Sequence, residues 1–401
     1  MDKKWIRPRH YVVRTVIGFF FYPFCSRRYR VKIERFKEQE KRPYLILLNH
    51  QTAYDQFFVG YSFRGPVYYL ASEDLFSNGW VSSLIRWLVA PIPIKKQATD
   101  LAAVKNCIRV AREGGTIAIA PEGNRTYSGK TEYMSPAIAG LARKLGMPIV
   151  LYRIEGGYGV HPRWSDVIRR GKMRSYVSRV IQPEEYANMT NDELFAIIEK
   201  ELHVDEAVAD TRFLSSKRAE YLERAMYVCP DCGLSTFESH GNEIACKKCG
   251  KTIRYEEDKR LSGVDCAFPY AFVKDWYAYQ ESFVNALDVT AYTDAPLYTE
   301  NTSLSEVIVY KHKEKLCKDA TIELYGDRFV IRGEGLETLQ LPFDEVTAVS
   351  VLGRNKLNIY HNNRVYQLKS DKRFNALKYV NIYYRWKNIT RGDENSTFLG
   401  I

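Results

Sequence analysis

The sequence predicts an α/β domain with a mixed sheet and flanking helices, then a small four-cysteine module and a mainly β C-terminal domain. Short apolar runs alternate with helix-like segments from about residue 43, two CxxC pairs lie between residues 229 and 249, and alternating strands with turn signals dominate past about residue 265. With 401 residues, 45% of them hydrophobic, two or three domains with real cores are expected.

The excess positive charge lies at the N-terminal end. The formal net charge is +11, and residues 1–42 hold 13 Lys and Arg against 4 Asp and Glu. A basic end interleaved with apolar residues suits an anionic membrane surface, whereas a uniformly basic chain would indicate nucleic acid more strongly. Between Cys229 and Cys249 only Lys247 and Lys248 are basic, so a nucleic-acid partner is not expected.

Residues 11–25 are the one candidate for a span or a signal. This stretch is shorter than the roughly 20 residues of a spanning helix and contains Arg14, and no small-residue cleavage site follows it. We interpret it as an interfacial helix that places Phe19, Phe20 and Phe21 in lipid, which predicts a peripheral or monotopic protein. A buried first helix of the globular domain is the alternative.

The elements of the α/β domain follow in order. Strands are expected at 43–49, 67–72, 90–94, 116–123 and 148–156, because each is a short apolar run. Helices are expected at 99–115, 137–146 and 191–202, and residues 206–226 also have a helical pattern. This rhythm places functional residues at the carboxyl ends of the strands.

The first motif is Asn49-His50-Gln51-Thr52-Ala53-Tyr54-Asp55, directly after a buried strand. Five positions cover about 500° of a straight helix, so His50 and Asp55 do not share a helical face. A turn between them would bring the carboxylate to one imidazole nitrogen and leave the other as a base. By itself such a pair is structural more often than catalytic.

The second motif is Ala120-Pro121-Glu122-Gly123-Asn124-Arg125-Thr126, again after an apolar strand. Gly123 permits close backbone approach, and the guanidinium of Arg125 matches a phosphate. The alternative is a strand-to-loop corner with a solvated arginine. The chain has no G-x-S-x-G nucleophile elbow, and Ser128-Gly129-Lys130-Thr131 lacks the glycine spacing of a P-loop.

Together, NHQTAYD, then PEGNRT about 70 residues later, then MPIVLYRIEG, resemble the glycerolipid acyltransferase family, which includes lysophosphatidic acid acyltransferases. The resemblance covers roughly residues 10–205. It implies transfer of a fatty acyl group from acyl-CoA or acyl-carrier protein to the hydroxyl of a lysophospholipid such as 1-acylglycerol-3-phosphate. His50, oriented by Asp55, would act as the general base, as in the family's NH-x4-D block.

The resemblance also implies the binding residues. Glu122, Gly123 and Arg125 would shape the acceptor site, and Lys96 stands where the family has a phosphate-binding arginine. Four positions depart from the family's pattern: Lys95 for aspartate, Asn124 for threonine, and Thr52 and Thr126 for serine. Lys95 adds positive charge near the expected headgroup and leaves the identity of the acceptor open.

The cysteine pairs have the spacing C-x2-C-x13-C-x2-C, formed by Cys229, Cys232, Cys246 and Cys249. Four thiolates from two knuckles suit tetrahedral zinc in a closed, structural site, as in a zinc ribbon, with iron as the minor alternative. His240 is expected to be a bystander. Such thiols without a secretory signal indicate a reducing compartment, hence the cytoplasmic face of a membrane.

The C-terminal strands precede a helix-like segment at 374–386, and this order loosely resembles a pleckstrin-homology or GRAM domain. Four regions are therefore expected: a basic membrane-surface region (1–42), an acyltransferase domain (43–205), a helical linker with a zinc ribbon (206–258) and a β-rich domain (259–401). The alternative function is a catalytically inactive lipid-binding or scaffolding protein, which would account for the altered block at Lys95 and Lys96.

Overall fold

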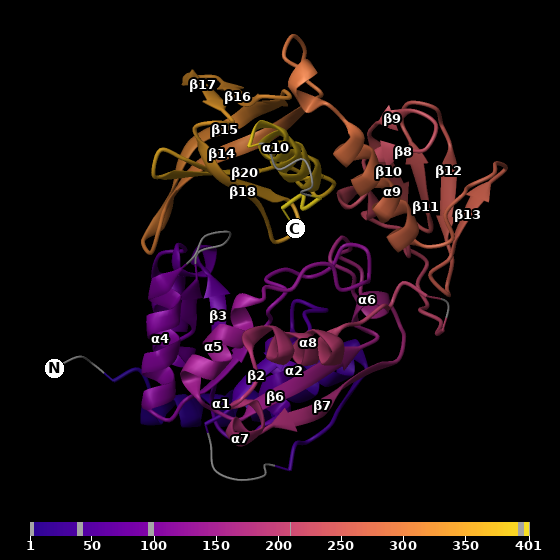
Figure 1. Cartoon of the computed structure of the whole chain (residues 1–401). Coiled ribbons are helices and arrows are strands. Elements are labelled where there is room, and N and C mark those ends of the chain that lie inside the picture. Colours follow the sequence, from indigo (N-terminus) through magenta and orange to yellow (C-terminus); the bar gives the residue numbers. More distant parts are fainter. Residues whose placement is uncertain (1–3, 38–42, 95–99, 209, 392–396, 401) are drawn as a thin grey trace. The chain divides into compact units, whose positions relative to one another are not determined.

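The computed structural model describes residues 4–37, 43–94, 100–208, 210–391 and 397–400. The chain forms two compact units, the first made of residues 1–163 and 168–215 and the second of residues 164–167 and 216–401 (Figure 1). The finer division into four regions stays a prediction.

The first unit is built on a seven-stranded sheet with the order β1-β7-β6-β2-β5-β3-β4. Strands β2 to β6 are parallel to one another, β7 is antiparallel to β6, and β1 is parallel to β7, so the predicted mixed sheet is confirmed. The strands are β1 (Val31–Ile33), β2 (Leu45–Leu48), β3 (Val67–Ser72), β4 (Ile92–Ile94), β5 (Thr116–Ile119), β6 (Ile149–Glu155) and β7 (Met173–Ile181).

Helices cover both faces of this sheet. They are α1 (Pro8–Tyr29), α2 (Asp55–Ser62), η1 (Glu73–Phe76), α3 (Trp80–Val89), α4 (Leu101–Arg112), α5 (Ala137–Leu145), α6 (Gly157–Val160), α7 (Pro183–Tyr186) and α8 (Asn191–Leu202). Alternate residues of β2 enter different cores: Leu45 and Leu47 pack with α4, α5 and α8, while Ile46 and Leu48 pack with α1 and α2. Burial on both faces explains why this strand is an uninterrupted apolar run.

The expected interfacial helix is longer than predicted and has two different faces. One face of α1 packs on α2, where Arg14 Nη2 donates to the carbonyl oxygens of Gly60 (3.1 Å) and Phe63 (2.5 Å). The other face leaves Phe19 and Phe20 70–75% exposed. One face of α1 is therefore buried, as the second alternative expected, while contact of its exposed face with lipid stays a prediction. Among the described residues, no helix is both long and apolar enough to cross a membrane.

The second unit begins with the cysteine module. Its strands are β8 (Val228–Cys229), β9 (Gly233–Leu234), β10 (Phe237–His240), β11 (Glu243–Cys246), β12 (Thr252–Tyr255) and β13 (Leu261–Val264). β8 and β9 form a two-stranded sheet, and β10 to β13 form an antiparallel sheet in chain order.

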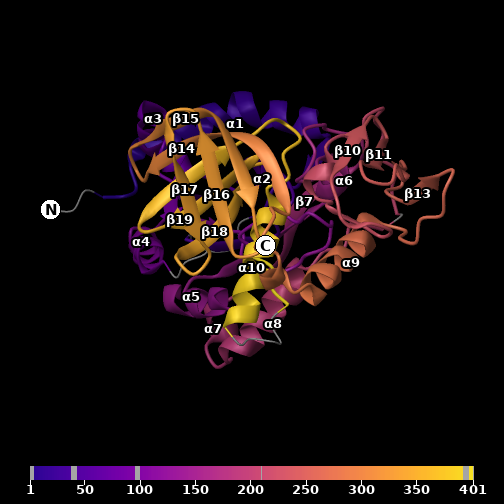
Figure 2. The ribbon, with the colours of Figure 1, turned by 90° about the horizontal axis from the view of Figure 1, so that it is seen from above.

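The rest of this unit is an antiparallel seven-stranded sheet with the order β17-β16-β15-β14-β20-β19-β18 and helix α10 packed against β18 (Figure 2). Its elements are α9 (Val273–Ala286), η3 (Val289–Ala291), β14 (Tyr298–Ile308), β15 (His312–Leu324), β16 (Arg328–Gly333), β17 (Leu336–Pro342), β18 (Val346–Leu352), β19 (Lys356–His361), β20 (Arg364–Lys369) and α10 (Leu377–Thr390). The predicted mainly β region with a terminal helix is therefore present.

Buried polar contacts hold the cysteine module to α9 and α10. The Gln280 Oε1 atom accepts hydrogen bonds from the backbone N–H groups of Tyr227 (2.7 Å) and Val228 (3.2 Å), and the Tyr227 hydroxyl donates to Asn381 Oδ1 (2.7 Å). The indole N–H of Trp276 donates to the Val228 carbonyl at 2.9 Å. Because these groups are buried, losing the module's structure would leave several of their partners unsatisfied.

The prediction of a helix at 206–226 is wrong. Among its described residues only η2 (Leu222–Arg224) is helical, and it is a single 3₁₀ turn. Leu214 forms a β-bridge with Arg170 instead, and the buried guanidinium of Arg224 bonds to the Trp164 carbonyl (3.0 Å) and to Asp166 (2.9 Å). Long-range contacts therefore override the local helical pattern in this segment.

Candidate active site and cysteine cluster

The predicted turn between His50 and Asp55 is present. Strand β2 ends at Leu48 and α2 begins at Asp55, and the intervening residues fold back so that His50 Nδ1 lies 2.8 Å from Asp55 Oδ2. The Asp55 side chain is 2% exposed and the His50 side chain 30% exposed. With Nδ1–H donating to Asp55, the Nε2 atom of this partly exposed side chain keeps its lone pair and can accept a proton.

The carboxylate of Asp55 is held by several donors at once. Its Oδ2 accepts from the backbone N–H of Gln51 (2.8 Å), and its Oδ1 accepts from the Thr52 N–H (2.9 Å) and the Thr52 hydroxyl (2.6 Å). Asp55 is also the first residue of α2, where negative charge is favourable. The orientation of the imidazole is thus fixed by a carboxylate that is itself immobilised.

Asn49 anchors the start of the same turn, a role that sequence reasoning did not assign. Its side chain is fully buried and bonds to Ile154 at the end of β6 in both directions: Nδ2 donates to the Ile154 carbonyl and Oδ1 accepts from the Ile154 N–H, each at 2.8 Å. Asn49 belongs to the first motif, but its partner lies 105 residues away, so the contact was not visible in the sequence.

Glu122 and His50 follow the ends of two neighbouring parallel strands and are joined by a hydrogen bond. It follows the end of β5, which pairs directly with β2, and its Oε1 accepts the His50 backbone N–H at 3.0 Å. Burial raises the pKa of Glu122 to about 8, the His50 N–H acts against this shift, and the charges of Asp55 and Glu132 add to it. The carboxyl group is therefore mostly protonated at neutral pH.

The remaining residues of the second motif form the loop after Glu122. Gly123 has a φ of +69°, which glycine adopts without strain. The backbone of Arg125 is fixed by Arg163, whose Nη1 donates to the Arg125 carbonyl at 2.8 Å while its guanidinium stacks on Tyr127. Arg163 is 4% exposed, and it belongs to neither of the two motifs, so nothing in the sequence predicted this role.

The structure thus brings His50, Asp55 and Glu122 together and places Gly123 and Arg125 in the adjoining loop. Lys96, expected to bind phosphate, and Lys95 lie outside the described residues. The catalytic and binding roles of all these residues stay predictions.

The four cysteines of the two CxxC pairs converge. Their sulfur atoms all lie within 4.8 Å of one another, and Cys229 Sγ is 3.8 Å from Cys249 Sγ. That spacing is too long for a disulfide and matches the edge of a tetrahedron with metal–sulfur bonds of about 2.3 Å. His240 is not in this cluster; its Nε2 lies 3.0 Å from Glu238 Oε1.

Hydrogen bonds at Cys246 favour a thiolate. Burial acts to raise the pKa of this thiol, but the Ser235 hydroxyl, 3.0 Å from Sγ, and the backbone N–H groups of Cys249 and Lys248 lower it to about 7. The convergence of four sulfur atoms at tetrahedral spacing, with hydrogen-bond donors aimed at one of them, fits a metal ion.

Comparison with known proteins finds similarity over the part of the chain that contains both sequence motifs. A family model described as Acyltransferase matches residues 28–154. A 1-acyl-sn-glycerol-3-phosphate acyltransferase of Bacillus subtilis is 23% identical over 137 residues, which is 34% of this chain and 65% of the relative. A chloroplastic 1-acyl-sn-glycerol-3-phosphate acyltransferase of Arabidopsis thaliana is 22% identical over 181 residues, 43% of this chain and 48% of the relative.

Among solved structures, a 1-acyl-sn-glycerophosphate acyltransferase from Thermotoga maritima matches 49% of this chain and 80% of its own, with 22% identity and a TM-score of 0.40. The chain spans less than two thirds of the length of either curated relative.

Proposed function

We propose that this chain is a membrane-surface O-acyltransferase that esterifies a lysophospholipid such as 1-acylglycerol-3-phosphate. The match of residues 28–154 to an Acyltransferase family model and the similarity to 1-acyl-sn-glycerol-3-phosphate acyltransferases support this proposal. The acyl donor in this proposal is a thioester, either acyl-CoA or acyl-carrier protein. The observation that carries the proposal is the His50–Asp55 pair, held at 2.8 Å beside Glu122 at the ends of adjacent parallel strands.

In the proposed reaction, His50 Nε2 removes the proton from the acceptor hydroxyl as its oxygen attacks the thioester carbonyl. The carbon–sulfur bond then breaks, an ester forms, and the proton on Nε2 passes to the departing thiolate, so that charge and atoms balance. Asp55 stabilises the transient imidazolium and keeps the tautomer correct.

The protonation of Glu122 bears on acceptor binding. A lysophosphatidate carries a phosphate, and an ionised carboxylate next to it would repel that group. With a pKa of about 8, Glu122 is mostly protonated at pH 7 and has an O–H to donate. We therefore assign Glu122, Gly123 and Arg125 to the acceptor site. Lys96 is assigned to the same site from the sequence resemblance alone.

The metal belongs to the second unit in this proposal. Zinc held by Cys229, Cys232, Cys246 and Cys249 would have no open coordination position, so its role is structural. It would join the turn that follows β8 to the turn that follows β11, and so hold the two CxxC pairs together.

Membrane association is proposed to be peripheral, on the cytoplasmic face. It would use the exposed faces of α1 and α3, on which Phe19, Phe20, Trp80 and Trp87 are each at least half exposed. Aromatic residues on amphipathic helices partition to the membrane interface.

Product formation tests the proposal. Purified protein is supplied with labelled acyl-CoA or acyl-carrier protein and a panel of lysophospholipids, and the lipid products are separated. We expect diacylglycerol-3-phosphate from 1-acylglycerol-3-phosphate. No product from any pair, with folded protein bound to vesicles, would favour the inactive lipid-binding alternative.

A further inference from the structure

We propose that an arginine pocket at the C-terminal end of α1 binds the phosphate group of an anionic membrane lipid, separately from the acyl acceptor. The pocket has a volume of about 320 Å³. It is lined by Phe24, Arg27, Arg28, Arg30, Ile168, Arg169 and Arg170. The inference rests on the membrane-surface part of the proposed function and not on its chemistry.

Two segments far apart in the sequence form the pocket, and both are tied to the region of α6. The Tyr29 hydroxyl lies 2.9 Å from His161 Nδ1, which fixes the end of α1. The backbone N–H of Arg169 donates to the Val160 carbonyl at 2.8 Å, and Arg170 forms a bridge with Leu214. The arginines are thus presented by a rigid backbone, which lowers the entropic cost of binding a ligand.

The charge of the pocket is unbalanced. Among the described residues, no acidic side chain lines it, and Arg27, Arg28, Arg30 and Arg170 form no ion pair. Arg169 is buried, with 2% of its surface exposed, and its Nη1 donates to the Gly159 carbonyl at 3.3 Å. Like charges so close together repel one another, and a bound anion relieves that repulsion. Guanidinium groups match the geometry of phosphate oxygens.

The surroundings of the pocket indicate that the phosphate comes from a lipid. Val16, Phe20, Phe24 and Arg28 follow one another along α1 at four-residue spacing, so an exposed apolar row leads into the pocket. Phe24 is itself 59% exposed and lines the pocket. A surface that is apolar along the helix and cationic at its end matches the acyl chains and headgroups of a membrane.

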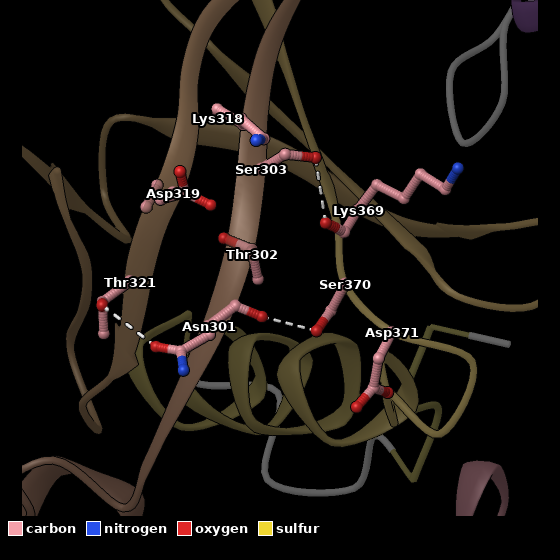
Figure 3. A pocket seen from close by; sticks show the side chains of 10 residues that line it. Asn301, Thr302, Ser303, Lys318, Asp319, Thr321, Lys369, Ser370 and Asp371 are labelled. Carbon is pink, nitrogen blue, oxygen red and sulfur yellow. Dashed lines mark hydrogen bonds between the residues drawn. The ribbon is translucent and has the colours of Figure 1, made fainter. Parts of the chain in front are cut away.

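A second pocket, of about 490 Å³ between β14, β15 and the end of β20, has a different character (Figure 3). It is lined by two lysines, Lys318 and Lys369, and by two aspartates, Asp319 and Asp371, so their formal charges cancel. The Ser370 hydroxyl donates to the Asn301 carbonyl at 2.5 Å. This pocket has no net charge and therefore no preference for an anion, in contrast to the arginine pocket.

Vesicle flotation of the full chain tests the inference. The variant Arg27→Gln with Arg170→Gln removes two exposed charges from the pocket. The control, Arg112→Gln with Arg143→Gln, removes two exposed arginines of α4 and α5 in the same unit. On vesicles of phosphatidylcholine with phosphatidylglycerol, we expect the pocket variant to bind at least about tenfold more weakly than wild type, since each cation near an anionic surface contributes about 1 kcal/mol. The control pair is expected to stay within about twofold of wild type. Equal weakening by both pairs, or equal wild-type binding to phosphatidylcholine alone, would overturn the inference.

A calorimetric titration with inorganic phosphate separates a lipid from a free phosphate. Saturable phosphate binding that the pocket variant loses, with its vesicle binding unchanged, would assign the pocket to a soluble anion and contradict the proposal. Acyl transfer in neutral detergent micelles separates the inference from the proposed function. If wild type binds anionic vesicles through the pocket but transfers no acyl group, only the proposed function fails. If it transfers acyl groups but the pocket variant binds vesicles normally, only the inference fails.

Discussion

His50 and Asp55, five residues apart in the sequence, lie with Nδ1 and Oδ2 2.8 Å apart because the chain turns back between the end of β2 and the start of α2. The backbone N–H groups of Gln51 and Thr52 bind the same carboxylate, so the turn and the pair form one structure. Substitutions that disturb the carboxylate should therefore affect both catalysis and the local fold.

Asp55→Asn replaces an acceptor oxygen with an N–H donor that faces other donors. We expect kcat for acyl transfer to fall about 10²–10⁴-fold, because the imidazole loses the partner that fixes its tautomer. The free energy of unfolding should fall by about 1–3 kcal/mol. Asp100→Asn, at the N-cap of α4, is the matched control for an aspartate at a helix start, and its kcat should stay near the wild-type value.

Asn49→Ala removes the two hydrogen bonds that join the start of the turn to Ile154. The Ile154 N–H and carbonyl then lose buried partners, so denaturant unfolding should show a loss of about 1–3 kcal/mol, and kcat should fall with it. Asn191→Ala, at the exposed start of α8, should change neither by much. Unchanged stability and unchanged kcat in Asn49→Ala would show that this anchor does not position His50.

Glu122→Gln should change how stability depends on pH. A folded-state pKa of about 8, above the ordinary 4.5, means that the stabilising contribution of the protonated carboxyl is complete below about pH 4.5 and is lost as the pH rises through 8. Between about pH 5 and 8, wild type should therefore lose about 1–3 kcal/mol more than Glu122→Gln in urea unfolding. Parallel pH profiles for the two proteins would contradict the raised pKa.

Zinc removal should destabilise the second unit. We expect the purified chain to contain zinc by elemental analysis, and Cys249→Ser or a strong chelator to lower its free energy of unfolding by about 3 kcal/mol or more. Cys266→Ser, outside the cluster, should have little effect. A metal-free wild-type protein with the same melting temperature after chelation would exclude a structural metal.

Much of the first unit was predictable because it depends on local patterns. The continuous apolar run at Leu45–Leu48 predicted a strand buried on both faces, and the pattern at Asn191–Leu202 predicted α8 with the bounds observed. The His50–Asp55 turn was predictable because five residues on a helix would have kept the two side chains apart.

The rest depends on contacts that no local pattern encodes. The expected helix at 206–226 gave way to the bridge of Leu214 with Arg170 and to the ion pair of Arg224 with Asp166. The raised pKa of Glu122 depends on how deeply the fold encloses it, and the arginine pocket joins α1 to a segment about 140 positions later in the sequence. Tyr22 and Cys25 of α1 are buried in the core, so point substitutions on its exposed face test membrane binding better than removal of the helix.

The role of His50 as general base is tested by the initial rate of acyl transfer to 1-acylglycerol-3-phosphate. Wild type and His50→Ala are compared, with His203→Ala at the exposed end of α8 as the control. We expect a loss of about 10²–10⁴-fold in kcat for His50→Ala at an unchanged melting temperature, and no loss for His203→Ala. Full activity in His50→Ala would contradict the assignment of His50 as the general base.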